Sequence, residues 1–243
     1  MYTEFRPASG DTASTPEVWA DTFRNSGRYG IKTAASHTLD SRWRLIKRYV
    51  RRGGRVLDAG CGFGEWVVFL SRRGYNAEGL DYSPELISRL RREYADLSWV
   101  EGRTQSIPVP DATFDAIVSW GVIEHDPNGP QRALAEFRRV LTAAGRLIVT
   151  VPADTERMRA DSKAQFPGEG KFFQFLFKPE ELNSALSRAS FKVIESGYCG
   201  KNAQTLLFPK SRHVSAPMRA IVKALPAIPG YHSMIYAVCE RSG

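Results

Sequence analysis

The sequence predicts an α/β protein with a doubly wound sheet and helices on both faces of that sheet. Apolar patterns typical of strands and of helices alternate along the chain. The strand pattern over 54–59 ends in a glycine-rich turn, and the strand pattern over 76–81 ends in an acid about twenty residues further on. Because doubly wound sheets bind ligands at the carboxyl ends of their strands, these observations indicate a nucleotide-like ligand.

Seven strand patterns follow one another along the chain, and helix patterns precede the first strand and separate most of the first five. The strands are predicted near 54–59, 76–81, 97–101, 114–120, 144–151, 191–198 and 232–239. The helices are predicted at 42–52, 65–73, 84–94 and 130–141. Gly74 is well placed to close the second of these helices.

The turn after the first strand holds alternating glycines, Gly60, Gly62 and Gly64, and Asp58 precedes them. Glycine tolerates positive φ and lets backbone N–H groups approach a ligand closely. The helix start that follows favours a negative or polar group. Counting G-x-G-x-x-G from Gly60 puts Glu65 at the third glycine position, which disfavours a nicotinamide cofactor.

Asp81 ends the second strand and is predicted to accept hydrogen bonds from both hydroxyls of a ribose. The alternative is that Asp81 caps the helix that begins near Pro84. Ser83 is a good N-cap residue for that helix, so Asp81 is left for a ligand.

The third informative block is the strand over 114–120 with the polar, aromatic turn that follows it and ends in Glu124 and His125. The order D-x-G-x-G-x-G over 58–64 resembles motif I of the class I S-adenosylmethionine (SAM) dependent methyltransferases. The block over 114–125 resembles the F-D-x-V-x-x-x-x-V-x-E-H signature of their small-molecule, methyltransferase type 11-like branch.

This resemblance covers residues 52–152 well and extends more loosely over 178–182 and 191–194. It implies a Rossmann-like sheet of seven strands and SAM as the cofactor. It also implies cofactor contacts from Asp58, Gly60, Cys61, Gly62, Gly64, Asp81, Tyr82, Thr104, Gln105 and Trp120. Asp58 is expected either to order the glycine loop or to meet the ammonium group of the cofactor through water.

One position departs from the family pattern. Relatives usually have an acid after the residue equivalent to Gly102, where it meets the adenine amino group, whereas this chain has Arg103. An arginine cannot accept that hydrogen bond. We expect the side chain of Gln105 or the backbone of Thr104 to take its place.

His125 is the best-placed candidate for a catalytic residue, because it ends the fourth strand's turn, where the acceptor pocket of the family lies. Methyl transfer from a sulfonium is an in-line displacement, and a hydroxyl acceptor must also lose a proton to a base. The alternative is a structural histidine that packs on the next helix or contacts the cofactor by its backbone. Glu124 is expected to orient His125 or to bind a donor. His37 is a weaker second candidate, and His213 and His232 have no local reason to be catalytic.

The length of 243 residues favours one doubly wound domain with embellishments. Residues 1–41 are expected to form an N-terminal cover segment, and 42–243 the domain, with insertions at 153–178 and 199–230. The phenylalanines over 172–177 are expected either to line an acceptor pocket or to anchor their insertion in the core.

The net charge of +8 favours anionic partners or surfaces. Residues 42–52 carry six basic groups and no acid. They are expected to form either a solvated helix face or a face that contacts an anion. Residues 199–230 carry five basic groups and no acid, and are expected to form a lid or to make peripheral contact with a membrane.

Cys61, Cys199 and Cys239 suggest neither a disulfide framework nor a zinc site. No signal sequence or membrane span is recognised, which favours the cytoplasm.

These features predict a SAM-dependent methyltransferase that acts on an oxygen or nitrogen of a small molecule, such as a secondary metabolite, a glycan precursor or a lipid-like acceptor. One alternative is an RNA methyltransferase, which the basic charge would suit. The turn over 119–122 reads Ser-Trp-Gly-Val rather than the Asn/Asp-Pro-Pro-aromatic motif of base-amino methylases, which favours a small molecule over nucleic acid. The other alternative is a catalytically silent SAM-binding scaffold protein.

Overall fold

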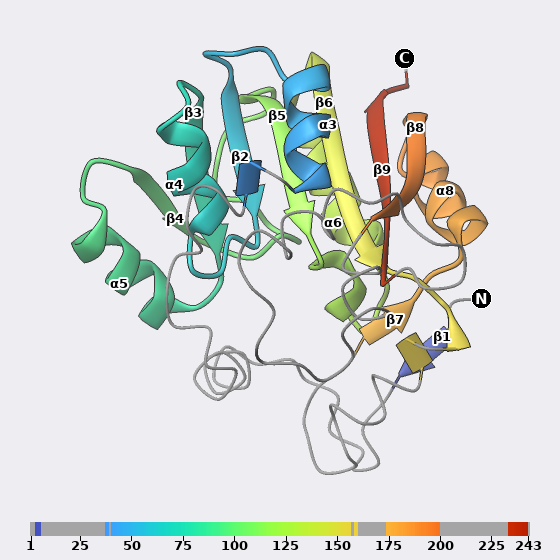
Figure 1. Ribbon diagram of the computed structural model, residues 1–243. Coiled ribbons are helices and arrows are strands. Elements are labelled where there is room, and N and C mark those ends of the chain that lie inside the picture. The colour runs from blue at the N-terminus through green and yellow to red at the C-terminus, as the bar shows by residue number, and fades with distance from the viewer. Residues whose placement is uncertain are drawn as a thin grey trace, which may run out of the picture.

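The computed structural model describes residues 3–5, 37–38, 40–156, 158–159, 174–199 and 233–242. Its main sheet has seven strands in the order β4-β3-β2-β5-β6-β9-β8 (Figure 1). The strands are β2 (Arg55–Ala59), β3 (Asn76–Asp81), β4 (Ser98–Glu101), β5 (Phe114–Trp120), β6 (Leu141–Pro152), β8 (Phe191–Cys199) and β9 (Met234–Arg241). Neighbouring strands run parallel except at β9, which is antiparallel to both β6 and β8. The predicted fold class is confirmed.

Helices cover both faces of this sheet, as predicted (Figure 1). The helices are α3 (Ser41–Tyr49), α4 (Glu65–Ser71), α5 (Pro84–Glu93), α6 (Gln131–Val140) and α8 (Pro179–Arg188). One core contains buried side chains of α3, α4 and α5, and the other contains those of α6 and α8. Each fully buried aliphatic or aromatic side chain contributes about 1.5 to 3 kcal/mol. The apolar stripes of the helices therefore fix which face each one covers.

Local sequence explains where the helices next to the glycine-rich edge begin. The Ser83 side chain accepts a hydrogen bond from the Leu86 N–H at 3.4 Å, and Pro84 occupies the first turn of α5. Ser83 therefore supplies the cap of this helix, as predicted. Asp40 caps α3 by accepting from the Arg42 N–H at 2.9 Å. This cap lies inside the predicted N-terminal cover segment, so the helix starts slightly earlier than expected.

The strand boundaries differ most from the sequence prediction at β6 and β9. β6 begins at Leu141, directly after α6, rather than near residue 144. Leu141 is fully buried and pairs with Phe114 of β5, with an irregularity before the regular register resumes at Ala116. The core contact of Leu141 thus extends the strand into a stretch whose sequence favours a turn. β9 also continues two residues beyond its predicted end at 239.

A second sheet of two short strands was not predicted. β1 (Thr3–Phe5) pairs antiparallel with β7 (Gln174–Leu176), which links the expected N-terminal cover to the expected insertion at 153–178. Three-residue strands carry too little periodicity to be recognised. Phe175 and Phe177 are buried in the core, so these two phenylalanines anchor their segment rather than line a pocket.

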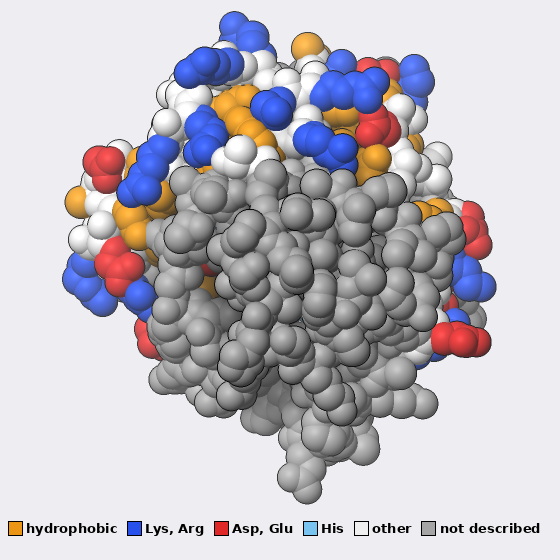
Figure 2. Space-filling view, viewed as in Figure 1, with side chains coloured by type: hydrophobic (Ala, Val, Ile, Leu, Met, Phe, Trp, Pro, Cys, Tyr) orange, Lys and Arg blue, Asp and Glu red, His pale blue; other side chains and the backbone are white. Residues whose placement is uncertain are grey.

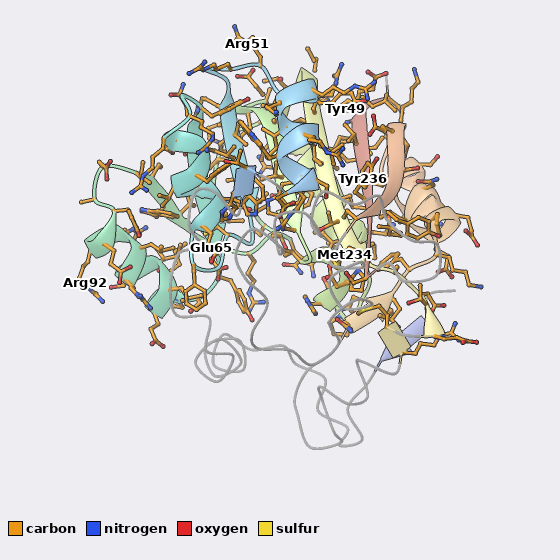
Figure 3. The ribbon with its side chains drawn as sticks, in the orientation of Figure 1. Tyr49, Arg51, Glu65, Arg92, Met234 and Tyr236 are labelled. Atoms are coloured by element: carbon orange, nitrogen blue, oxygen red, sulfur yellow. The ribbon has the colours of Figure 1, made fainter. Side chains whose placement is uncertain are left out.

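A hydrogen-bonded cluster fastens α3 to the antiparallel side of the sheet. The hydroxyls of Tyr49 and Tyr236 donate to the two carboxylate oxygens of Glu195, at 2.6 and 2.9 Å (Figure 3). The hydrogen bond from Tyr49 is the main reason that the pKa of Glu195 lies below its usual range. The position of α3 over β6 and β9 is therefore set by polar as well as apolar contacts.

Lys and Arg side chains gather in the upper part of Figure 2, where Figure 1 places α3 and the turn before β2. Exposed basic residues of this part of the chain are Arg44, Lys47, Arg48, Arg51 and Arg52. Figure 3 places Arg51 at the upper end, well above Glu65, which is the first residue of α4. The exposed basic face therefore lies away from the glycine-rich edge of the sheet.

Arg139 of α6 clamps the loop that joins β4 to β5. Its guanidinium donates to the Glu136 carboxylate, to Asp111, and to the backbone oxygens of Ile107 and Val109, at 2.8 to 2.9 Å. Glu136 in turn accepts from the Ile107 N–H at 2.7 Å. These bonds hold a loop that has no regular structure of its own.

Arg139→Met should lower the free energy of unfolding by about 1.5 to 3 kcal/mol, because several charge-assisted hydrogen bonds lose their donor. The melting temperature should fall by roughly 3 to 10 °C for a chain of this size. Arg138→Met on the same helix is the control, and its smaller effect in thermal unfolding is expected because Arg138 makes one 3.3 Å bond to the Ser242 oxygen. Equal melting temperatures for Arg139→Met and the unaltered chain would contradict the clamp.

Candidate functional site

The candidate site lies at the carboxyl ends of β2, β3 and β5, the lower edge of the sheet in Figure 1. The loops that leave these strand ends are the glycine turn 60–64, the turn 82–83 and the turn 121–122. Parallel strands bring their carboxyl ends to one edge, so residues far apart in sequence converge here.

The glycine turn has the backbone conformation that the sequence predicts. Gly60, Gly62 and Gly64 all have positive φ, at 87°, 51° and 71°. A Cβ on Gly60 would lie 2.5 Å from a methyl group of Val122, and one on Gly64 would strike the ring of Trp99. Gly60 and Gly64 are therefore required by the packing of the turn as well as by its conformation.

Asp81 connects the end of β3 to the glycine turn. Its Oδ2 accepts from the Gly62 N–H at 2.9 Å, and its Oδ1 accepts from the Ser83 N–H at 3.0 Å. Burial raises the pKa of Asp81, although these backbone hydrogen bonds oppose the increase. A carboxylate has about four acceptor sites, so both oxygens keep the capacity to accept from a ligand. The structure places Asp81 beside the glycine turn, as the sequence predicts.

Asp58 is the most unusual acid of the site. It lies on β2, is 2% exposed, and its Oδ1 has no hydrogen-bond partner among the described residues. Burial raises its pKa to about 7, Asp81 adds to the increase, and Arg42 opposes it. A buried acid without a partner is unfavourable for folding, which is the pattern expected of a group that binds a ligand.

Cys61 lies in the same turn but its thiol belongs to the core. The side chain is buried, and its Sγ would lie 2.9 Å from a Cβ placed on Gly79. Burial raises the pKa of this thiol well above its usual value, so the reactive thiolate form is disfavoured. The position selects a small side chain for packing, and a cofactor contact by its backbone stays a prediction.

The loop after β4 places Thr104 and Gln105 near the turn that follows β5. Gln105 Nε2 donates to Asp126 at 2.9 Å, and Thr104 Oγ1 donates to Gln105 Oε1 at 3.3 Å. Arg103 instead places its guanidinium 5.3 Å from the centre of the Tyr82 ring. Gln105 Oε1 retains one acceptor site, so the predicted substitute for the family's acid remains available.

The turn after β5 contains the two predicted catalytic residues. Glu124 and His125 lie on a short 3-10 helix, Ile123–His125, and His125 Nε2 is 3.7 Å from Glu124 Oε1. Glu124 is 1% exposed, burial raises its pKa to about 8, and its Oε2 has no hydrogen-bond partner among the described residues. Glu124 is therefore mostly protonated at pH 7. It also lies close enough to His125 to influence the orientation of the His125 ring.

Arg42 is the member of the site that sequence reasoning missed. Its guanidinium lies 4.9 Å from the ring centre of Trp66 and 5.3 Å from that of Trp120, and binds Asp40 through two hydrogen bonds of 3.0 and 2.7 Å. Helical spacing alone groups Arg42 with the solvated basic residues of 42–52. The acid two residues earlier, at the helix cap, was the available signal.

Two other predicted residues are also placed by the structure. The indole Nε1 of Trp120 is buried and has no hydrogen-bond partner among the described residues. His37 is buried, its ring centre is 4.8 Å from that of Trp66, and its Nε2 is 3.8 Å from Glu65. His37 thus packs at the start of α4, where its ring contacts favour a structural role.

Several predictions fall outside the described residues. They concern His213, His232, the first two phenylalanines of the cluster over 172–177, and nearly all of the insertion at 199–230. Within the part of the chain that the structure describes, no helix is long and apolar enough to cross a membrane.

Comparison with known sequences agrees with this geometry. A family model described as a methyltransferase domain matches residues 34–196. The malonyl-[acyl-carrier protein] O-methyltransferase of Serratia marcescens is 28% identical over 170 residues, which cover 70% of this chain and 66% of that protein. The demethylmenaquinone methyltransferase of Deinococcus radiodurans is 29% identical over 160 residues, covering 61% and 66%. The chain spans about two thirds or less of the length of such curated relatives.

Solved structures share the fold. The PH0226 protein of Pyrococcus horikoshii has a TM-score of 0.66 at 18% identity, covering 91% of this chain and 99% of that one. The 1,6-didemethyltoxoflavin-N1-methyltransferase of Burkholderia thailandensis, with bound 1,6-didemethyltoxoflavin and S-adenosylhomocysteine (SAH), has a TM-score of 0.62 at 16% identity, covering 98% and 94%. With a family model that matches residues 34–196 and the glycine turn beside two buried acids, the chain belongs to the methyltransferase domain family.

Proposed function

We propose that this methyltransferase transfers the methyl group of SAM to an oxygen or nitrogen of a small-molecule acceptor. The observation that carries this proposal is the pair Glu124 and His125 at the carboxyl end of β5. Glu124 is a buried acid whose Oε2 has no hydrogen-bond partner among the described residues, and His125 lies beside it. Such a pair suits a compact acceptor that must be oriented and deprotonated.

The cofactor is proposed to lie across the ends of β2 and β3. Asp58 would bind the ammonium group of the methionyl end, which suits its buried Oδ1, since this atom has no hydrogen-bond partner within the described part of the chain. The glycine turn 60–64 would pass beneath the same end of the cofactor, and Asp81 would accept from the ribose hydroxyls. When bound, SAM supplies an electrophilic methyl group on a good leaving group, so positioning contributes most of the catalysis that the protein provides.

The acceptor is proposed to approach the methyl group from the turn after β5. His125 would take the proton of a hydroxyl acceptor, and Glu124 would orient His125 or bind the acceptor. The 3.7 Å separation of His125 Nε2 and Glu124 Oε1 is too long for a hydrogen bond, so a small movement is needed for direct contact. Neutral Glu124 can donate a hydrogen bond, which an ionised acid cannot.

Names of relatives support a small-molecule or carrier-bound acceptor in general rather than a particular compound. The relatives include enzymes named for malonyl-[acyl-carrier protein] and for demethylmenaquinone, and a structural neighbour is named for a toxoflavin precursor. These names describe different acceptors, so the acceptor of this chain must be found by experiment.

Asp81→Ala is expected to weaken SAH binding by on the order of 1.5 to 3 kcal/mol, roughly ten- to over a hundredfold, because a bidentate charge-assisted contact is lost. Gly62→Val should weaken binding at least as much, since its backbone needs a φ of 51°. Isothermal titration with SAH measures both effects. Asp96→Ala, which changes an exposed acid, is the matched control. Unchanged affinity in both site variants would contradict this placement of the cofactor.

A screen of acceptors tests the proposed function. The chain is incubated with SAM and with pools of hydroxy, carboxy and amino compounds, and mass spectrometry detects a methylated product. A separate arm contains total RNA. Methylation of RNA alone, with strongly salt-dependent binding, would support the RNA alternative instead. SAH binding without any methylated product in either arm would support the silent scaffold.

A further inference from the structure

The exposed basic face of α3 and the turn before β2 carries more positive charge than the neighbouring acids neutralise. Arg48 is paired with Glu195 at 3.0 Å. The other cations of this face form no ion pair with a described residue, and they are Arg44, Lys47, Arg51 and Arg52. Figure 2 shows Lys and Arg side chains gathered over this region. Their charge is therefore available to an anionic partner.

The turn after α4 adds to the basic face. The Gly53 N–H donates to the Gly74 oxygen at 3.0 Å, so the turns before β2 and before β3 lie side by side. Arg72 is exposed in the second of these turns and also has no ion pair among the residues that the structure describes. The unpaired cations thus spread over one helix and two adjoining turns.

Aromatic rings form the floor of the basic face rather than its surface. The Arg73 guanidinium lies 3.7 Å from the ring centre of Phe69, and Lys47 Nζ lies 5.6 Å from that of Trp43. Such contacts stabilise a cation and limit its movement. Phe69 and Trp43 are only 4% and 8% exposed, so neither ring offers a platform on which a nucleotide base could stack.

We propose that the basic face docks the phosphate backbone of a double-stranded nucleic acid, without selecting its base sequence. The face lies away from the glycine-rich edge of the sheet, so the duplex holds the enzyme in place and is not its methyl acceptor (Figures 1 and 3). This inference goes beyond the methyl transfer proposed above and does not depend on it.

The kind and the spacing of the cations favour phosphate. Four of the five unpaired cations are arginines, whose planar guanidinium binds phosphate through two parallel hydrogen bonds. Arg44 and Lys47 are three residues apart on one side of α3, and Arg51 lies just beyond the end of this helix. A duplex carries one negative charge per about 1.7 Å of its axis, so such a row of cations meets several phosphates at once.

Two other anionic partners fit this face less well. An anionic membrane holds a basic patch firmly only with a second signal, such as a lipid anchor or an inserted apolar side chain. The exposed large apolar side chains among the described residues, Ile194 and Tyr198, lie on β8 and not on α3 or the two turns. A single strand gains much of its affinity from stacking on exposed aromatic rings. A duplex needs neither, because its bases already stack on one another.

Fluorescence anisotropy of the whole chain with a short, labelled RNA duplex of mixed sequence tests the proposal. We expect a Kd on the order of 10⁻⁴ to 10⁻⁶ M near physiological salt, the range of sequence-independent binding. A duplex of a different sequence should bind equally well. The logarithm of the association constant should fall linearly with the logarithm of the salt concentration, with a slope of about −0.9 for each phosphate that a cation neutralises.

The matched comparison removes two charges from the basic face or two from elsewhere. Arg44→Gln with Arg51→Gln should weaken duplex binding about tenfold or more and make the salt slope shallower by about 2, because two phosphate contacts are lost. Arg92→Gln with Arg132→Gln changes two exposed cations of α5 and α6 and should leave both values nearly unchanged. Both double variants should melt like the unaltered chain and bind SAH with the same affinity, because none of the four side chains belongs to the proposed cofactor site.

Five results would overturn the proposal. Equal losses in both double variants would indicate a response to net charge alone. Tighter binding to the corresponding single strand would assign the face to another form of nucleic acid. Binding to vesicles that contain anionic lipid, but not to the duplex, would make a membrane the partner. Methylation of the duplex in the presence of SAM would make it the acceptor, and no duplex binding at about 50 mM salt would leave the basic face as a solvated surface.

Discussion

Asp58→Asn should weaken SAH binding strongly and raise the melting temperature of the chain. The substitution leaves the cofactor's ammonium group without a counter-charge in a buried site, which costs about 2 to 5 kcal/mol, or roughly thirtyfold to several thousandfold in affinity. Because Asn is neutral and close in size to Asp, the packing around β2 should be preserved. Asp58 would thus be retained for binding at the expense of stability.

The stability effect has a defined dependence on pH. The pKa of Asp58 is raised from 3.8 to about 7 in the folded chain. Between these values the unfolded chain releases a proton that the folded chain keeps, so stability falls as the pH rises through this window. A pKa difference of about three units between the folded and the unfolded chain lowers the free energy of unfolding by about 4 kcal/mol by pH 8. This loss corresponds to a fall in melting temperature of at most roughly 8 to 16 °C. Below about pH 4 the aspartate and asparagine chains should differ little.

Thermal unfolding of Asp58→Asn at several pH values measures this dependence, and titration with SAH measures the affinity. Asp115→Asn is the matched control, because the Asp115 carboxylate accepts from the Arg55 N–H at 2.9 Å, away from the glycine turn. The control should not gain stability and should bind SAH normally. A lower melting temperature for Asp58→Asn, at every pH, would show that Asp58 stabilises the fold instead.

The glycine turn and Asp81 could be predicted from sequence because their function depends on local chemistry. Positive φ is needed at Gly60, Gly62 and Gly64, and glycine is the residue that adopts it easily. Asp81 is the last residue of its strand, so its place at the sheet edge follows from the strand itself. The bounds of β3 and β5 were also predicted correctly, because they too depend on the local sequence pattern.

Other properties depend on contacts between distant parts of the chain. The sequence indicates that Asp58 precedes the turn, but its burial, and the lack of a partner for its Oδ1 among the residues that the structure describes, depend on what packs around β2. Arg42 has the spacing of a solvated helix residue until α3 is placed over Trp66 and Trp120. The pairing of β1 with β7 joins segments far apart in sequence, and each is three residues long. Periodicity cannot predict such pairings.

His125→Ala is expected to lower turnover of a hydroxyl acceptor by about a hundredfold or more, because a general base contributes about 10² to 10⁴ to the rate. An acceptor that is already ionised at the assay pH needs no base and should lose much less. The measurement uses two phenols that differ in acidity, chosen from the compounds that the chain methylates. SAH affinity should stay close to that of the unaltered chain, because His125 is not assigned to the cofactor site.

His125→Asn separates proton transfer from structural support. Asn retains a polar side chain next to Glu124 but cannot act as the base, so it should lose as much rate as Ala on the un-ionised phenol. The position of His125, with 13% of its side chain exposed, also allows a structural role. Equal rate losses on both phenols, together with a large fall in melting temperature, would establish that structural role. A loss confined to the un-ionised phenol, in a variant that melts normally, is the result that proton transfer requires.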